Sequence, residues 1–481
     1  MRESCAFFRA REMAFSSLRF MGGRSISTRG LLVSAIAMAS VLSAPASAET
    51  ISGALARAYA GSPDLNQQRA LTRSVDENIP KATAGFRPTV TATTDFGSQF
   101  NDARVPARTT KTHTDPGGYQ LSVVQNLYNG NRTVNGVRQA DSQILQSRET
   151  LRTSEQNVLN AAAAAYMNVL RDTAIQNLRQ NNIEVLRQQL KQTTDRFKVG
   201  EVTRTDVAQS EAALAQGQSD AFVAQSNLQN SLAVYRQLIG VDAKSLDAAR
   251  ALETLVPRSL AEATNAALRE HPQVQAALHA ADAAELAVKL AEGVLYPTVN
   301  LTGLVNKRFE NANVPNARAL TASVVASLSV PIYDGGTATT NVRQTKELFG
   351  QARLQVDLAR ESVRATAVSA FNTWQNSRFV IEATQAAVRS NEIALAGIRE
   401  EAKVGQRTTL DVLNAQQLLL NARVNLITAQ RDRVVGSYAV VSAVGKLSAG
   451  TLGLKVDRYD PTIHYDQIKD KWWGVRTPDG R

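Results

Sequence analysis

Arg196-Phe-Lys-Val-Gly-Glu-Val-Thr-Arg-Thr-Asp-Val207 and Glu401-Ala-Lys-Val-Gly-Gln-Arg-Thr-Thr-Leu-Asp-Val412 are two versions of one stretch. Asn-Leu-Tyr-Asn-Gly at 126–130 and Pro-Ile-Tyr-Asp-Gly at 331–335 match at the same offset. Further upstream, Arg-Pro-Thr-Val at 87–90 matches Tyr-Pro-Thr-Val at 296–299, and Ser-Pro at 62–63 matches His-Pro at 271–272. Two similar halves of this length predict one structural unit built twice.

Long helices follow from where proline is missing. No proline lies between Pro116 and Pro257 or between Pro331 and Pro461, and proline breaks the interior of a helix. We therefore predict long helices over 130–240 and 335–447, with turns near 200 and 405. After each turn an apolar residue recurs every seventh position, which indicates coiled-coil packing: Val207, Leu214, Ala221, Leu228 and Tyr235, then Leu413, Leu420, Ile427, Val434 and Val441. Each half should hold a long antiparallel helical hairpin.

Ranges 87–129 and 296–334 have a different period. Apolar and polar residues alternate over about ten positions in four segments, which is typical of membrane-spanning β-strands. We predict one β-hairpin in each range, with polar external loops over 101–117 and 307–320. A small soluble sheet that caps the helices is the alternative. Since a closed barrel needs about eight strands and lipid does not tolerate an open sheet edge, membrane strands would require several copies of the chain.

The remaining segments complete the two repeats. A helix is expected over 49–86 in the first repeat and over 262–295 in the second, with a linker at 241–261 between them. Residues 448–481 depart from the helical pattern and form a periplasmic C-terminal segment, which either packs around the helices or wanders as a tail. Trp472 and Trp473 favour packing, because ordering them would bury much apolar surface.

The first 48 residues are typical of an export signal. Arg24 and Arg29 precede an apolar run from Leu31 to Leu42, and the small residues Ala46-Ser47-Ala48 provide a cleavage site before Glu49. A membrane anchor would need about 20 apolar residues. Residues 1–20 read as an extension, with Met1, Met13 and Met21 as alternative starts. The only cysteine, Cys5, lies in the removed segment, so the mature chain has no thiol chemistry and no N-terminal cysteine for a lipid.

Charge and composition exclude several functions. The net charge is +11. Part of it belongs to the export signal, which contains six Arg and only two acidic residues, Glu3 and Glu12. The remaining basic residues are spread among acids rather than clustered with aromatics, which argues against nucleic-acid binding. No metal-ligand spacing, nucleophile elbow or phosphate loop is present. We expect no enzyme activity, no cofactor and no metal.

In the order and content of these segments, residues 51–447 resemble the TolC family of outer-membrane efflux and type I secretion channels. The resemblance rests on Pro-Thr-Val at each first strand, on Tyr-Asn/Asp-Gly after each second strand, and on the paired turns quoted above. It implies a mainly α fold with membrane β, in which the duplicated hairpins form an α-helical barrel in the periplasm. Four strands per chain would contribute to a twelve-stranded outer-membrane β-barrel in a homotrimer.

The resemblance also implies a function and partners. The family's members are passive exit channels for drugs, small toxic compounds or proteins, opened by a periplasmic adaptor and an inner-membrane pump of RND or ABC type. The sequence does not decide between these cargoes or pumps. The rival interpretation is a soluble periplasmic coiled-coil scaffold or adaptor, which would have no use for four alternating segments.

Site residues carry over from the family to the two turns, here called the tips. The adaptor-docking residues are Val199, Gly200 and Thr203 in the first tip and Val404, Gly405 and Thr408 in the second. Asp206 and Arg407 correspond to a pair that latches the closed tip, and Asp411 corresponds to a ring of carboxylates that favours cations. Many members carry a second acidic ring where this chain has Asn414, and a latch tyrosine where it has Ala402. For both aspartates, capping the start of a helix is the alternative role.

Overall fold

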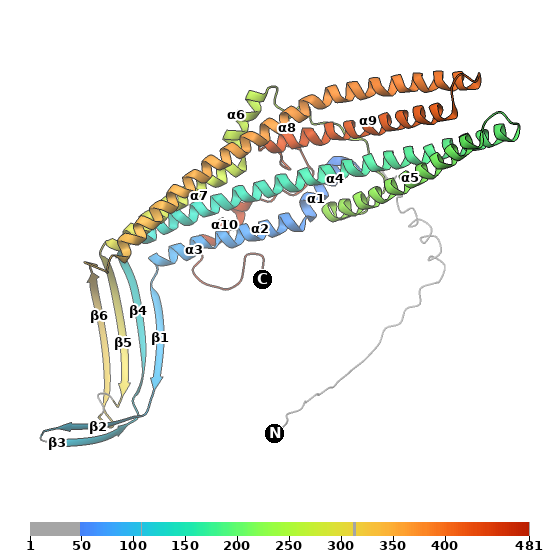
Figure 1. Ribbon diagram of the computed structural model, residues 1–481. Coiled ribbons are helices and arrows are strands. Elements are labelled where there is room, and N and C mark those ends of the chain that lie inside the picture. The colour runs from blue at the N-terminus through green and yellow to red at the C-terminus, as the bar shows by residue number, and fades with distance from the viewer. Residues whose placement is uncertain (1–48, 107, 311–313, 481) are drawn as a thin grey trace, which may run out of the picture. The chain divides into compact units, whose positions relative to one another are not determined.

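The computed structural model describes residues 49–106, 108–310 and 314–480. The expected export signal, residues 1–48, lies outside this part of the chain. The described residues form one compact unit, whose helices and strands are shown in Figure 1.

Each repeat begins with short helices rather than with one continuous helix. The first repeat has α1 (Ile51–Gly61), α2 (Pro63–Asp76) and α3 (Asn78–Thr83), and the second has α6 (Leu260–Glu270) and α7 (Pro272–Glu292). The expected single helices over 49–86 and 262–295 are therefore wrong in detail. Ser62 and His271 cap the following helices and a proline occupies their first position, where proline starts a helix but cannot continue one. Short 3₁₀ turns, η1 (Ala84–Phe86) and η2 (Gly293–Leu295), lead into the strands.

The main sheet is four-stranded and antiparallel. Its strands are β1 (Thr89–Phe96), β4 (Gly117–Asn129), β5 (Thr298–Phe309) and β6 (Arg318–Ser329), in the spatial order β1-β4-β5-β6. Each repeat supplies one β-hairpin, and β4 joins β5 across the repeat boundary. β1 and β6 are the two edges, as Figure 1 shows.

Both expected external loops need correction. The range 101–117 holds most of a second, two-stranded antiparallel ribbon, β2 (Gln99–Val105) with β3 (Arg108–Thr114). Alternating threonines in β3 explain why polar sequence still forms a strand, because threonine favours extended backbone. In the second repeat β5 extends to Phe309 and β6 begins at Arg318, so the connection is shorter than 307–320.

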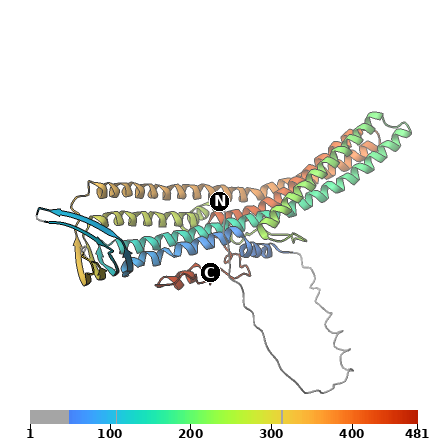
Figure 2. The ribbon, with the colours of Figure 1, turned by 90° about the horizontal axis from the view of Figure 1, so that it is seen from below.

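Four long helices dominate the chain. α4 (Arg132–Lys198) and α8 (Thr337–Lys403) have 67 residues each, and at about 1.5 Å per residue each spans roughly 100 Å. α5 (Arg204–Ile239) packs back along α4, and α9 (Thr409–Ala443) packs back along α8. Both hairpins run side by side in Figures 1 and 2. In the series of apolar residues at every seventh position of α5, Ala221, Leu228 and Tyr235 are buried, as coiled-coil packing requires.

The largest core lies where the two hairpins, α1 and the C-terminal segment meet. Small residues such as Ala162 and Ala163 let the helices approach closely, and Tyr166 is fully buried beside them. The Tyr166 hydroxyl bridges the carbonyl oxygens of Glu49 and Asp247 at 2.6 and 2.7 Å. It thereby ties the start of the first repeat to the linker that follows α5.

The C-terminal segment is held against the helices, but not by its tryptophans. Its one helix, α10 (Pro461–Ile468), packs on α2, and both lie beside each other in Figures 1 and 2. Trp472 and Trp473 are 70% and 93% exposed, so the expectation that they pack is wrong. The buried side chains of Leu454 and Ile468, together with hydrogen bonds to buried partners on α1 and α2, hold this segment instead.

Candidate functional site

The four-stranded sheet has one apolar and one polar face. Residues paired across antiparallel strands point to the same side, so the register defines both faces. The first face is mainly apolar: Val90, Ala92, Phe96, Tyr119, Leu121, Val123, Val299, Leu301, Val305, Leu320, Ala322, Val324, Ala326 and Leu328. The second is mainly polar: Thr91, Thr93, Asp95, Gln120, Ser122, Asn300, Thr302, Asn306, Arg308, Thr321, Ser323 and Ser327. On the polar face Arg308 forms an ion pair with Asp95, and Asn126 donates to Asn300 at 2.9 Å.

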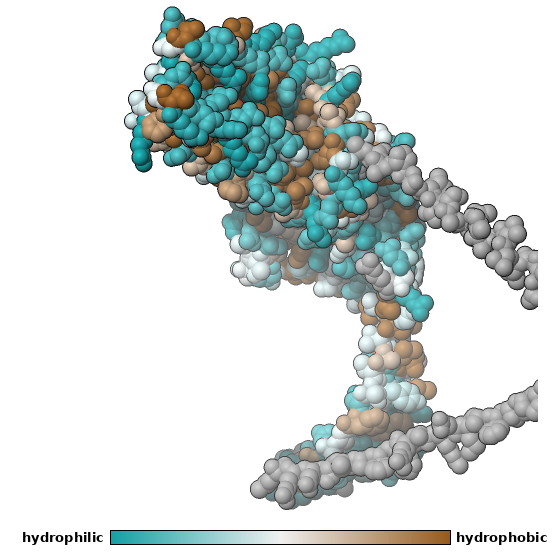
Figure 3. Space-filling view, turned by 90° about the vertical axis from the view of Figure 1, so that its right-hand side faces the viewer, coloured by the Kyte–Doolittle hydropathy of each residue, from teal (hydrophilic) through white to brown (hydrophobic). Residues whose placement is uncertain are grey.

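Aromatic side chains lie at both ends of the sheet. Phe96, Tyr119 and Phe309 are at the end near the β2–β3 ribbon, where the rings of Tyr119 and Phe309 meet edge to face. Phe86, Tyr128, Tyr296 and Tyr333 are exposed at the end near the long helices. In Figure 3, neutral and hydrophobic residues dominate the narrow strand region, whereas hydrophilic residues cover most of the visible helical surface. An apolar band between two aromatic girdles is typical of outer-membrane strands.

Each tip ends its first long helix in the same way. Glu201 N–H donates to Arg196 O at 2.9 Å and Gly200 N–H donates to Phe197 O at 3.0 Å. The second tip has the equivalent bonds. Gly200 and Gly405 both have φ of +79°, a left-handed conformation that favours glycine at a helix C-terminus. An added Cβ would meet no atom within 4 Å at either glycine, so the backbone angle rather than space in this chain disfavours a side chain.

Each tip also starts its second helix in the same way. Thr203 N–H donates to Asp206 Oδ2 at 2.9 Å while Asp206 N–H donates to the Thr203 hydroxyl at 3.3 Å. Thr408 and Asp411 repeat this capping box at 3.0 and 3.2 Å. The Thr203 hydroxyl and N–H lower the pKa of Asp206, and the Thr408 N–H and hydroxyl lower the pKa of Asp411. Both aspartates therefore take the capping role and remain ionised.

The residues expected in the latch are not paired within one chain. Arg407 Nε instead donates to Glu401 Oε2 at 2.8 Å. Arg407 lies in the loop after α8, and Glu401 lies in the last turn of that helix. The first tip mirrors this with Arg196 and Glu201, also at 2.8 Å. Asn414 is exposed on α9, so it shares a helix with Asp411 but adds no charge.

The tips also expose apolar side chains. Val199 and Val404 are 76% and 71% exposed and lie directly before the two glycines. Thr203 and Thr408 are exposed as well. Each tip therefore presents a bare Val-Gly step with a threonine close by.

The family model described as outer membrane efflux protein matches residues 54–241 and 263–446. The chain belongs to the outer membrane efflux protein family. This outer membrane efflux protein is 39% identical to the outer membrane efflux protein BepC of Brucella suis biovar 1 (strain 1330), over 90% of this chain and 93% of that protein. It is 29% identical to the outer membrane protein TolC of Escherichia coli (strain K12), over 62% of this chain and 63% of that protein. The expected resemblance to the TolC family is thus confirmed.

The fold of this outer membrane efflux protein matches solved channels. The Campylobacter jejuni CmeC outer membrane channel superposes with a TM-score of 0.75 at 16% identity, over 87% of this chain and 89% of that chain. The expected fold class of long helical hairpins with membrane β is confirmed. Among residues 49–106, 108–310 and 314–480, no helix is both long and apolar enough to cross a membrane. In the same ranges no three His, Cys, Asp or Glu side chains are grouped as a metal site.

Two structural features of this outer membrane efflux protein, a hollow and a polar network, were not predicted from the sequence. A hollow of about 570 Å³ lies between the two hairpins close to the tips, and its lining is rich in amides: Gln188, Gln189, Gln192 and Gln416, with Arg196, Arg399 and Lys403. Gln188, Gln189 and Gln192 lie on one side of α4, because residues three or four positions apart share a helix face. This spacing could have been recognised in the sequence. The second feature had no signal, because it joins distant segments.

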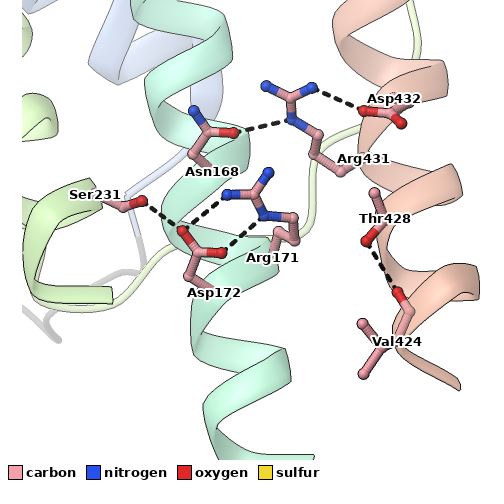
Figure 4. A network of polar contacts seen from close by, with 8 residues as sticks. All are labelled: Asn168, Arg171, Asp172, Ser231, Val424, Thr428, Arg431 and Asp432. Carbon is pink, nitrogen blue, oxygen red and sulfur yellow. Dashed lines mark hydrogen bonds and ion pairs between the residues drawn. The ribbon is translucent and has the colours of Figure 1, made fainter. Parts of the chain in front are cut away.

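That second feature is a polar network between the hairpins, shown in Figure 4. Asp172 on α4 accepts two bonds from Arg171, at 2.7 and 3.0 Å, and a third from Ser231 on α5. Arg431 on α9 reaches Asn168 on α4 at 3.0 Å. The bonds of Asp172 hold α4 to α5 within the first hairpin, and the bond from Arg431 to Asn168 joins the second hairpin to the first.

Proposed function

We propose that this chain forms, as a homotrimer, the exit duct of a tripartite export system that a periplasmic adaptor and an inner-membrane pump complete. The chain lies in the outer membrane, with its helices in the periplasm. The observation that carries the proposal is the two-faced sheet with two open edges. An open edge is not tolerated in lipid, and three copies would supply the twelve strands of one closed barrel.

The two faces of the sheet suit the two sides of such a barrel. The apolar face with its aromatic girdles fits the lipid, and the polar face fits a water-filled lumen. The charged pair Asp95–Arg308 and the pair Asn126–Asn300 would then line the path of the cargo. The same two faces argue against a soluble scaffold, because no helix covers the apolar face among the described residues.

The tips would form the periplasmic gate. Three copies of Asp411 would make a ring of three carboxylates, held ionised by the capping bonds from Thr408, and such a ring favours cations. Asn414 leaves this entrance with fewer charges than a doubly acidic one. Asp206 and Arg407 would latch the closed gate between subunits, with Arg407 exchanging Glu401 for Asp206.

The adaptor would dock on the exposed surface of the tips. Val199, Gly200 and Thr203, and their counterparts Val404, Gly405 and Thr408, present apolar contacts beside a backbone without side chain. The cargo would be drugs, small toxic compounds or proteins that the pump delivers.

Channel recording in planar bilayers tests the proposal. The purified protein should migrate as a heat-modifiable trimer and should form cation-preferring channels of low resting conductance. Arg407→Ala and Asp206→Asn should raise that conductance, whereas Glu401→Gln should not if the latch pairs Arg407 with Asp206. A monomer that forms no channels would contradict the proposed duct, and a leak in Glu401→Gln alone would contradict the proposed latch.

A further inference from the structure

Three apolar side chains near the C-terminal end are almost completely exposed. Trp472, Trp473 and Val475 are 70%, 93% and 100% exposed. Tryptophan carries a large apolar surface that usually finds a partner. Their exposure in this single chain therefore indicates a surface that something else covers.

The exposure does not come from a loose chain end, because the segment is fixed on both sides of the tryptophans. Before them, Tyr459 N–H donates to the Tyr59 hydroxyl at 3.1 Å, and His464 Nδ1 lies 3.0 Å from Oδ2 of the fully buried Asp76. After them, Asp479 forms an ion pair with Arg73 at 3.6 Å. The tryptophans are thus presented at a defined place.

That place is the foot of the membrane sheet. Arg87 lies two residues before β1 and donates through Nη1 to Lys471 O at 2.8 Å. Its guanidinium carbon lies 4.6 Å from the centroid of the Trp472 ring. The neighbouring Phe86 is exposed and belongs to the girdle with Tyr128, Tyr296 and Tyr333. Trp472 therefore continues this girdle from a different part of the chain.

The length of the strands sets the level of this girdle. β5 has 12 residues, which at about 3.3 Å each and a tilt of about 45° rise roughly 28 Å. This is close to the hydrocarbon thickness of a bilayer, about 30 Å. Residues at the foot of the strands hence lie at the interface between lipid and periplasm, where tryptophan and tyrosine are enriched.

The charges around the tryptophans fit phospholipid headgroups. Lys469 is paired with Asp466 at 2.8 Å, but Arg87, Lys471 and Arg476 lie beside or next to the tryptophans, and basic residues beside interfacial aromatics are attracted to lipid phosphates. We infer that residues 471–476 are a membrane anchor that inserts Trp472, Trp473 and Val475 into the periplasmic leaflet of the outer membrane. The partner is phospholipid, and the inference rests on the proposed placement of the sheet in the bilayer.

Depth-dependent fluorescence quenching tests this anchor. The chain has three tryptophans, so Trp374→Phe leaves Trp472 and Trp473 as the only reporters. The trimer is reconstituted into vesicles of phosphatidylethanolamine and phosphatidylglycerol that carry a nitroxide either at the headgroup or at the end of the acyl chain. The headgroup nitroxide should quench the pair several-fold more strongly than the chain-end nitroxide.

Two single-tryptophan variants, each in a chain with Trp374, Trp472 and Trp473 changed to Phe, serve as controls. Val324→Trp, in the middle of β6 on the apolar face and 76% exposed, should be quenched by the chain-end nitroxide. Phe222→Trp, on α5 and 71% exposed, should be quenched by neither.

The outcomes separate the anchor from the proposed duct. A pair that escapes quenching while Val324→Trp is quenched overturns the anchor and leaves the duct standing. Blue-shifted emission of the unquenched pair would then assign it to a neighbouring subunit, and red-shifted emission would leave it in water. If Val324→Trp also escapes quenching, the result contradicts the placement of the sheet in the membrane, and therefore contradicts the anchor as well.

Discussion

In the proposed duct, single residues at the tips combine a structural role in the turn with a role in docking or gating. Gly200 and Gly405 end a helix through a left-handed backbone and leave bare surface beside Val199 and Val404. Asp206 and Asp411 cap the next helix through oxygens that, in the proposed gate, would also carry the charge of the entrance. Substitutions at these positions must therefore separate the structural job from the functional one.

A bulky side chain at a tip glycine should block export without dismantling the trimer. Gly405→Asp adds about 1–2 kcal/mol of local strain through its left-handed φ, but no atom of this chain lies in the way. The proposed adaptor-docking surface would be lost instead. We expect drug-susceptible cells with normal amounts of heat-modifiable trimer. Gly350→Asp, inside α8 toward its start and equally free of neighbours, is the control and should export normally.

The entrance charge can be removed while its cap is kept. Asp411→Asn retains an oxygen that accepts from the Thr408 N–H, so the helix start should persist while three charges disappear from the trimer. We expect reversal potentials to show a large loss of cation preference and weaker block by trivalent cations. An unchanged cation preference would leave Asp411 with the capping role alone.

The same site predicts a pH dependence. Within one chain the bonds from Thr408 lower the pKa of Asp411 below the ordinary 3.8, whereas the two other carboxylates of the proposed ring would raise it. Cation preference, read from reversal potentials, should fall as the pH drops through the range in which Asp411 becomes protonated.

At the scale of elements, caps decide where the short helices begin. His271 caps α7 by accepting from the Gln273 N–H at 3.2 Å through Nδ1, which must then be unprotonated. The side chain is 9% exposed, and burial lowers its pKa from 6.5 to about 4. The second repeat therefore contains an acid-sensitive helix start that the first repeat, with Ser62 at the equivalent position, lacks.

This cap should make the trimer less stable at mildly acidic pH. The depressed pKa stabilises the fold above pH 6.5, and that contribution disappears as the pH falls from 6.5 toward 4. The lost free energy of unfolding is about 3 kcal/mol per chain, from 1.36 kcal/mol for each unit of pKa. His271→Asn keeps a good cap and should flatten the dependence of the melting temperature on pH. Ser62→Asn, at the equivalent cap of the first repeat, changes no titratable group and should leave that dependence as it is in the wild type.

At the scale of the whole molecule, the sheet cannot be completed by one chain. β1 and β6 are both edges, whereas the helical hairpins are already paired. The membrane part therefore depends on the neighbours more than the periplasmic part does.

Two adjacent residues of β6 test which face meets lipid. Val324→Arg places a charge on the apolar face near the middle of the strand, which costs about 2–4 kcal/mol at the bilayer centre. Val325→Arg places the same charge on the polar face, where water is expected. We expect few heat-modifiable trimers in outer membranes for the first variant and near wild-type amounts for the second. Equal amounts of both would contradict the assignment of the faces.

The sequence by itself determined the features that depend on local signals. The missing prolines located the two stretches that hold the long hairpins, and the predicted turns at 200 and 405 lie two residues beyond the observed ends of α4 and α8 at 198 and 403. The repeated Val-Gly stretches located both tips, and Asp206 and Asp411 after them marked both helix starts. The alternation of apolar and polar residues located four strands, since a period of two separates the faces of a sheet wherever it lies.

The tertiary structure alone decided the contacts between distant segments. Arg407 has several acids within reach along the chain, and only the folded turn selects Glu401. Arg431 meets Asn168 because two hairpins pack side by side. The tryptophans looked like core residues, yet Arg87 holds them at the foot of β1 with most of their surface exposed. Helix ends and strand periods are encoded within a few residues, whereas burial depends on which surfaces the whole fold brings together.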